Sequence, residues 1–211
     1  MVSSKYTSSR TGKPFAVIHS GKRNAPTVLI NLLHDTSTPV LALLAEKYGL
    51  HRIPGLTGQA LITRILGHLS DEALLDLKNE LVAAHFGDLP VRDLLEVAIA
   101  GQQENGGGTS KPRLDQISLQ EATLLDSGPP RWEYTMRGHD QVIDLEHRLL
   151  ACDCEFFTFS SKRQVLCKHL ATAFQVIPPA YAREALIDLL VLRQYGDRRE
   201  GRWYFESTHA A

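Results

Sequence analysis

The chain has 211 residues, 43% of them hydrophobic, and a formal net charge of −1. This is enough for one compact unit or two small domains with a real core, and the near-zero charge argues against a uniformly basic nucleic-acid coat. No apolar run approaches the roughly 18 to 20 residues of a membrane helix, and the N-terminus lacks a charged-then-apolar signal segment. We expect a globular protein with no membrane contact.

Residues 1–36 are predicted to form a basic arm with short strands. Five cations precede the first acidic residue, Asp35. Such an arm would lie on phosphates, although its serines equally suit a solvated terminus. Two apolar stretches, at 15–18 and 28–33, predict short strands or a strand followed by the start of a helix.

Residues 37–100 have the pattern of a helical bundle. Start signals for four helices stand at Ser37, Thr57, Ser70 and Pro90, and apolar residues follow each at helical spacing. Glycines end three of these helices, at positions 49, 87 and 101.

Part of this bundle resembles two DNA-binding patterns. The spacing of Gly49-Leu50 to Leu61–Ile65 resembles a SAP-type helix pair, and the sequence at 53–56 resembles a helix-hairpin-helix turn. Backbone amides at a helix N-terminus bind phosphate. The candidate nucleic-acid contacts here are Arg52, Thr57, Gly58 and Arg64, and a plain helical bundle with capped turns is the alternative.

Residues 101–130 are predicted to be a flexible linker. Three successive glycines at 106–108 lie among polar residues, and a Gly-Pro-Pro break closes the segment at 128–130. Between them, apolar residues at 117–125 predict a short helix.

Residues 131–177 are predicted to form a β-hairpin that leads into a metal site and a helix. All three cysteines stand there, as Cys152-Asp153-Cys154 and, after twelve residues, Cys167-Lys168-His169. Thiolate and imidazole in two short pairs are the ligands of a structural zinc site, so we expect Zn²⁺ on Cys152, Cys154, Cys167 and His169. Metal-binding thiols fit a reducing intracellular compartment, the cytoplasm or a nucleus. The alternative is that the cysteines are small buried hydrophobes.

Side chains around these ligands have further predicted roles. His169 would lie in the first turn of a helix that ends near Pro178. The aromatic cluster Phe156, Phe157 and Phe159 would pack beneath the metal as core rather than serve as a stacking platform for bases.

The cysteine and histidine pattern, with these phenylalanines and the helix start at Cys167-Lys168-His169-Leu170, resembles the SWIM zinc finger over residues 131–177. Many SWIM sequences have proline and alanine where this chain has Asp153 and Thr172. The resemblance implies zinc binding together with DNA or protein binding. SWIM modules occur in the SWIM subunits of Shu-type recombination complexes, in transposases, beside Swi/Snf-type helicases and in ubiquitin-ligase-like proteins.

Residues 178–211 are predicted to be a C-terminal helix, over 181–195, and a tail. The apolar stripe of this helix would pack on the rest of the chain or dock a partner subunit. In the tail Arg198, Arg199 and Arg202 precede the aromatic run at 203–205. That mixture suits single-stranded nucleic acid, and it suits equally a terminal strand that pairs back onto the protein.

The chain lacks a Walker-type phosphate loop, a nucleophile elbow and an H-E-x-x-H pair, and four protein ligands leave zinc no open position for catalysis. We therefore expect an α+β protein, with an N-terminal helical bundle, a SWIM-like ββα zinc module and a C-terminal helix, that is not an enzyme. The resemblance implies an accessory protein for DNA recombination or repair that works with a RecA-like recombinase relative and contacts DNA. The alternatives are a targeting or regulatory module of a transposase, helicase or ubiquitin-ligase system, or a structural protein adaptor.

Overall fold

The structure, a computed structural model, describes residues 25–51, 53–100, 122–126, 128–197 and 201–207. Within these ranges the fold is α+β. Its helices are α1 (Ala25–Asp35), α2 (Thr38–Lys47), α3 (Gly58–His68), α4 (Asp71–Phe86), α5 (Val91–Ala100), α6 (Glu155–Ser160), α7 (Lys168–Val176) and α8 (Pro179–Tyr195), with a 3-10 turn, η3 (Ser161–Arg163). Its strands are β1 (Ala122–Asp126), β2 (Arg131–Met136), β3 (His139–Asp144), β4 (Leu149–Cys152) and β5 (Tyr204–Glu206).

The four helices predicted between residues 37 and 100 are confirmed as α2 to α5. Local capping explains where two of them begin. The hydroxyl of Thr57 accepts a hydrogen bond from the Ala60 amide at 3.3 Å, and the hydroxyl of Ser70 accepts one from the Ala73 amide at 3.3 Å. Each bond satisfies an amide that has no partner within its own helix, so the polar residue fixes the first turn.

Of the two alternatives predicted for 28–33, a short strand or the start of a helix, the helix is observed, because these residues lie in α1. Val28, Leu29, Leu32 and Leu33 are all buried. Their spacing places them on one face of a helix, but a short continuous apolar run suits a buried strand as well. The predicted basic arm and the strand at 15–18 lie outside the described residues.

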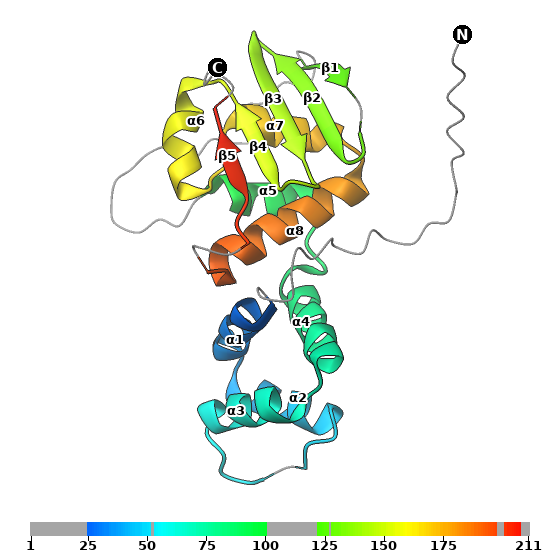
Figure 1. Cartoon of the computed structure of the whole chain (residues 1–211), viewed down its shortest axis with the longest axis vertical. Coiled ribbons are helices and arrows are strands. Elements are labelled where there is room, and N and C mark those ends of the chain that lie inside the picture. Colours follow the sequence, from blue (N-terminus) through cyan, green and yellow to red (C-terminus); the bar gives the residue numbers. More distant parts are fainter. Residues whose placement is uncertain (1–24, 52, 101–121, 127, 198–200, 208–211) are drawn as a thin grey trace, which may run out of the picture.

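The helices divide between two lobes, which Figure 1 shows one above the other. In the helical lobe, made of α1 to α4, α1 packs against α3 and α4, and α2 packs against α3. The sheet lobe contains the five strands with α5 to α8 and η3. Helix α8 belongs to the sheet lobe and also packs against α1 and α4, so it connects the two.

Helix α5 does not share the packing expected for a 37–100 bundle. It lies mainly against α8 and α7, beneath the sheet. Leu94, Leu95, Ala98 and Ile99 form its buried stripe. The periodicity of a helix shows that one face is buried, and gives no information on which element covers that face.

The strands form one sheet in the order β1-β2-β3-β4-β5, antiparallel except for the parallel pair β4 and β5. The predicted hairpin is confirmed as β2 and β3. Its turn is Arg137-Gly138, and both residues have positive φ, of 51° and 74°. Positive φ at both central residues is the requirement of the tight turns that match the twist of two strands.

Strand β1 corrects the end of the helix predicted over 117–125. It pairs with β2, with an irregularity between Leu124 and Asp126, and its two leucines, Leu124 and Leu125, are exposed. Pairing across the sheet outweighed the local apolar spacing that had favoured a helix. The rest of the predicted linker, 101–121, lies outside the described residues.

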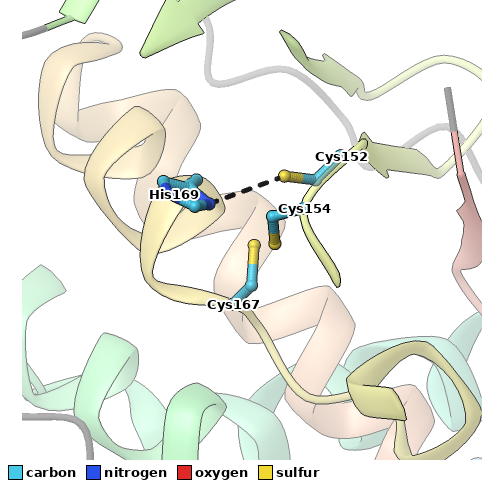
Figure 2. Close-up of side chains that lie close together, drawn as sticks. All are labelled: Cys152, Cys154, Cys167 and His169. Carbon is cyan, nitrogen blue, oxygen red and sulfur yellow. Dashed lines mark hydrogen bonds between the residues drawn. The ribbon is translucent and has the colours of Figure 1, made fainter. Parts of the chain in front are cut away.

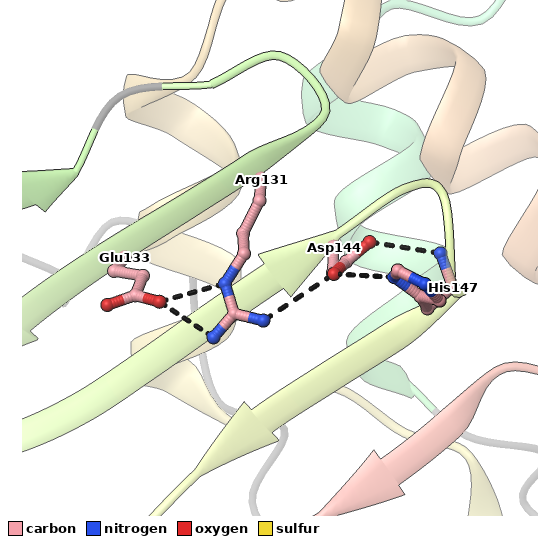
Figure 3. A network of polar contacts seen from close by, with 4 residues as sticks. All are labelled: Arg131, Glu133, Asp144 and His147. Atoms are coloured by element: carbon pink, nitrogen blue, oxygen red, sulfur yellow. Dashed lines mark hydrogen bonds and ion pairs between the residues drawn. The ribbon is translucent and has the colours of Figure 1, made fainter.

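The connection from β3 to β4 is held by Asp144 (Figure 3). One oxygen of its carboxylate accepts a hydrogen bond from the His147 amide at 2.9 Å, and the other lies 3.0 Å from Nδ1 of the His147 ring. Arg131 approaches the same carboxylate at 3.6 Å and pairs with Glu133 at 2.7 Å. Asp144 is buried, so these contacts compensate for its loss of hydration.

The C-terminal region confirms the helix predicted over 181–195 as α8, and its apolar stripe is covered by the chain itself. Beyond it, β5 pairs with β4, and the buried Trp203 donates a hydrogen bond to Asp188 at 3.0 Å. Of the two predictions for the tail, the returning strand is therefore the one observed. Every helix within the described ranges is too short or too polar to cross a lipid bilayer.

Candidate metal centre

Three elements bring the four candidate ligands together. Cys152 is the last residue of β4, Cys154 precedes the first residue of α6, Cys167 precedes the first residue of α7, and His169 lies in the first turn of α7, as predicted. Figure 2 shows the three thiols and the imidazole directed toward one another. The sheet thus delivers one ligand, and two helix starts deliver the other three.

The distances fit one metal ion. All four side chains are buried, and their ligand atoms lie within 4.8 Å of one another. The Cys152 sulfur is 3.9 Å from Nδ1 of His169. Tetrahedral zinc, with bonds of about 2.0 to 2.3 Å, holds its ligand atoms about 3.5 to 3.8 Å apart. The cluster can therefore hold a metal ion after small side-chain movements.

The three thiols ionise unequally. Hydrogen bonds from Cys152 and then Cys167 lower the pKa of Cys154. The hydrogen bond to Cys154 raises the pKa of Cys152 to about 12, and burial, followed by the hydrogen bonds with the other two thiols, raises the pKa of Cys167. Three thiolates in one buried cluster repel each other, so full ionisation requires a cation between them. A bound divalent ion supplies that charge.

A second histidine supports the ligand cluster, and nothing in its sequence position singled it out. The ring of His139, at the start of β3, packs against the ring of His169 with their centroids 4.6 Å apart. Its Nδ1 lies 2.8 Å from the carboxylate of Asp153, the residue between the first two ligands. Residues around a metal site orient its ligands in this way. The carboxylate inside the C-x-C pair was the only signal for this interaction in the sequence.

Arg193 of α8 supports the loop that leads to the third ligand. Its guanidinium donates hydrogen bonds to Val97 O at 2.9 Å and Ala98 O at 3.1 Å, and lies 3.5 Å from Gln164 O. The Leu166 amide donates to Ala98 O as well, at 3.3 Å. Burial lowers the pKa of Arg193. One half-buried cation thus joins the end of α5 to the loop before Cys167.

The predicted aromatic cluster divides. Phe157 is buried and stacks on Phe205 of β5, with centroids 5.7 Å apart, so its predicted place in the core is confirmed. For Phe156 and Phe159 the prediction is wrong, because 54% and 74% of their surfaces are exposed. The three residues belong to a helix, which turns the outer two away from the face that carries Phe157.

The predicted nucleic-acid contacts do not form one site. Gly58 and Arg64 belong to α3 in the helical lobe and Thr57 is its N-cap, whereas Arg202 lies before β5 in the sheet lobe (Figure 1). Arg52, Arg198 and Arg199 lie outside the described residues.

Contacts within the protein account for the candidate residues at α3, and no bound ligand is needed to explain them. The Thr57 hydroxyl caps its own helix, and Arg64 donates to His51 O at 2.8 Å. A Cβ atom on Gly58 would lie 3.1 Å from the Thr38 hydroxyl, so glycine allows α2 and α3 to approach closely.

No family model, curated protein or solved structure matches this chain. The chemistry of the site therefore comes from its own residues. Four buried protein ligands can hold a metal ion and join β4, α6 and α7 at one point.

Proposed function

We propose that this chain is a non-enzymatic zinc-binding accessory protein for DNA recombination or repair, built around a SWIM-like zinc site. The observation that carries the proposal is the buried Cys₃His cluster, whose four ligand atoms lie within 4.8 Å of one another. Three thiolates and one imidazole are a typical structural zinc set, in which protein atoms take all four positions. Zinc bound there acts as a crosslink and a source of folding energy.

The DNA part of the proposal rests on the resemblance of residues 131–177 to SWIM modules. A SWIM subunit of the Shu type works beside a RecA-like recombinase relative, and we propose a partner of that class here. A targeting or regulatory module of a transposase, helicase or ubiquitin-ligase system would use the same zinc site.

A structural protein adaptor is the second candidate, and two observations favour it. The net charge is −1, and the described phosphate-binding candidates on α3 and before β5 lie in different lobes. Such a protein would bind partners without touching nucleic acid.

Metal analysis tests the first step of the proposal. Protein purified without added metal should contain about one zinc per chain by elemental analysis, and Cys154→Ser and His169→Ala should lose it. Lys168→Ala, which changes an exposed residue between two ligands, is the matched control and should keep the metal. Full-length protein without bound metal and with unchanged thermal melting would reject the zinc site.

Partner capture from native extract, with and without nuclease, tests the second step. A RecA-like recombinase relative among the captured proteins supports the accessory role. A transposase, helicase or ubiquitin ligase supports the targeting module. Partners of none of these classes, retained after nuclease treatment, support the adaptor.

A further inference from the structure

The segment between the two ligand pairs exposes an aromatic and basic face. Helix α6 continues directly into η3, so residues 155–163 form one helical run. Phe156, Phe159 and Arg163 stand at i, i+3 and i+7 on this run and are exposed, as is Lys162. Residues at that spacing share one side of a helix. We name Phe156, Phe159, Lys162 and Arg163 the α6 face.

The opposite side of the same run is anchored in the protein. Phe157 is 1% exposed and stacks on Phe205, and Ser160 is buried and donates a hydrogen bond to the Phe157 carbonyl at 3.3 Å. The run also starts directly after the ligand Cys154. The two exposed phenylalanines therefore lie on a backbone that is anchored in the core. Their exposure is not the result of a position in a mobile tail.

Local charge distinguishes the segment that carries this face from the outer face of the sheet. Residues 155–168 carry three exposed cations, including Lys168, against one acid, Glu155. The sheet face away from the helices is different. It carries Arg131 together with the acidic residues Glu133, Asp140 and Glu206, so its local charge is negative. A polyanion is attracted by the first surface and repelled by the second.

We propose that the α6 face binds single-stranded nucleic acid. Bases stack on the exposed phenylalanine rings, whose Cβ atoms at i and i+3 lie about 5 to 6 Å apart, and Lys162 and Arg163 contact the phosphates. Bases inside a duplex are already stacked on each other, so the rings discriminate in favour of single strands. This inference rests on the proposed function, because zinc fixes the segment that carries the face, and it deepens it by naming a ligand.

The test is fluorescence anisotropy of full-length, zinc-loaded protein with a labelled oligothymidine of about 30 nucleotides and with a duplex of equal length, at low salt. Phe156→Leu/Phe159→Leu keeps both side chains apolar and removes their aromatic faces. We expect this variant to bind the single strand about tenfold more weakly and the duplex unchanged. Val40→Ala/Leu43→Ala, which changes two exposed apolar residues on α2, is the matched control and should bind as wild type does.

Salt dependence tests the basic part of the face. Lys162→Glu/Arg163→Glu should bind more weakly and should reduce the slope of log affinity against log salt, by about 0.7 for each phosphate of a single strand that the variant no longer neutralises. Zinc content and circular dichroism should stay unchanged in both α6 variants, since all four side chains are exposed.

Three results would overturn the inference. They are no binding of the single strand by wild type, equal binding by wild type and the leucine variant, or equal weakening on duplex and single strand. If Arg198→Glu/Arg199→Glu/Arg202→Glu alone removes binding, the tail is the DNA site and the α6 face is not. None of these outcomes affects the zinc measurement or the partner capture, so failure here is distinguishable from failure of the proposed function.

Discussion

The two lobes are stabilised in different ways. In the helical lobe, α1 to α4 bury leucine and isoleucine side chains against one another, and hydroxyl caps begin α3 and α4. In the sheet lobe, a short β4, a six-residue α6 and a nine-residue α7 converge on four ligands. Such short elements have little stability alone. The helical lobe therefore depends on distributed packing alone, whereas the sheet lobe combines a packed core with one candidate metal centre that joins its shortest elements.

The difference predicts where each lobe is vulnerable. Truncation of one side chain in a distributed core costs a few kcal/mol, whereas removal of a structural metal takes away most of the energy that orders its ligand segments. Helix α8 packs against both lobes, so damage at the centre should weaken the junction as well. Experiments that separate stabilisation by packing from stabilisation by the metal centre follow, from the largest expected effect to the smallest.

Metal removal should have the largest effect. Chelation or Cys154→Ser should unfold residues 131–177, because structural zinc supplies about 10 to 16 kcal/mol in small peptides. Helices α2 and α3 should keep their amide protection in hydrogen exchange, since they pack on each other and α3 also packs on α1. Equal loss of protection in α3 and α7 would show that the lobes do not differ in this way.

A matched pair of core substitutions should come next. Leu32 in α1 and Leu170 in α7 are both 0% exposed. Replacing either by alanine should lower the free energy of unfolding by about 2 to 5 kcal/mol, measured by urea denaturation. Only Leu170→Ala should also speed zinc transfer to a chromogenic chelator, because Leu170 adjoins His169 and its amide donates to the Cys167 sulfur at 3.4 Å.

Arg193→Met should destabilise the sheet lobe by about 1 to 3 kcal/mol, because it keeps an apolar stem but removes the guanidinium donor to the Val97 carbonyl and leaves the Ala98 carbonyl with the Leu166 amide alone. Faster zinc release should accompany the loss. Arg183→Met, whose guanidinium donates to the Gly87 carbonyl, is the control and should leave zinc release unchanged.

Asp153→Ala should weaken zinc binding about tenfold in competition with a chelator, with little change in the fold. The substitution removes the carboxylate that holds His139 against the His169 ring. His139→Ala should have a similar effect, and the double variant should be no weaker than the worse single variant. Additive losses would show that the two side chains act independently.

The smallest effect concerns pH. Burial opposes ionisation of Asp144, but hydrogen bonds from the His147 amide and ring outweigh it and lower the Asp144 pKa, while the same ring contact raises the pKa of His147. The contribution of Asp144 is present above about pH 4 and is lost as the pH falls through its lowered pKa. That of protonated His147 is full below about pH 6.5 and is lost as the pH rises through its raised pKa.

His147→Gln should therefore lower the melting temperature by a degree or two at about pH 5.5, and by less at about pH 8.5. The His147 ring is largely exposed, so solvent weakens the interaction. A difference between variant and wild type that grows with pH would contradict the assignment.

The sequence by itself determined the local features of this protein. Hydroxyl and proline signals before apolar stripes predicted α2 to α5, because capping and helical periodicity involve residues within one or two turns. The spacing of Cys152, Cys154, Cys167 and His169 predicted the ligand cluster, because a zinc site restricts which residue types can lie together.

Only the tertiary structure decided the features that depend on contacts between residues far apart in the sequence. The apolar run at 28–33 became a helix because α3 and α4 cover it, and residues 122–126 became a strand because β2 pairs with them. The contact between His139 and His169 joins β3 to α7, which are about thirty residues apart in the chain. The exposure of Phe159 depends on which side of α6 packs against β5. Periodicity specifies a face, and the neighbour that covers it is set by the whole fold.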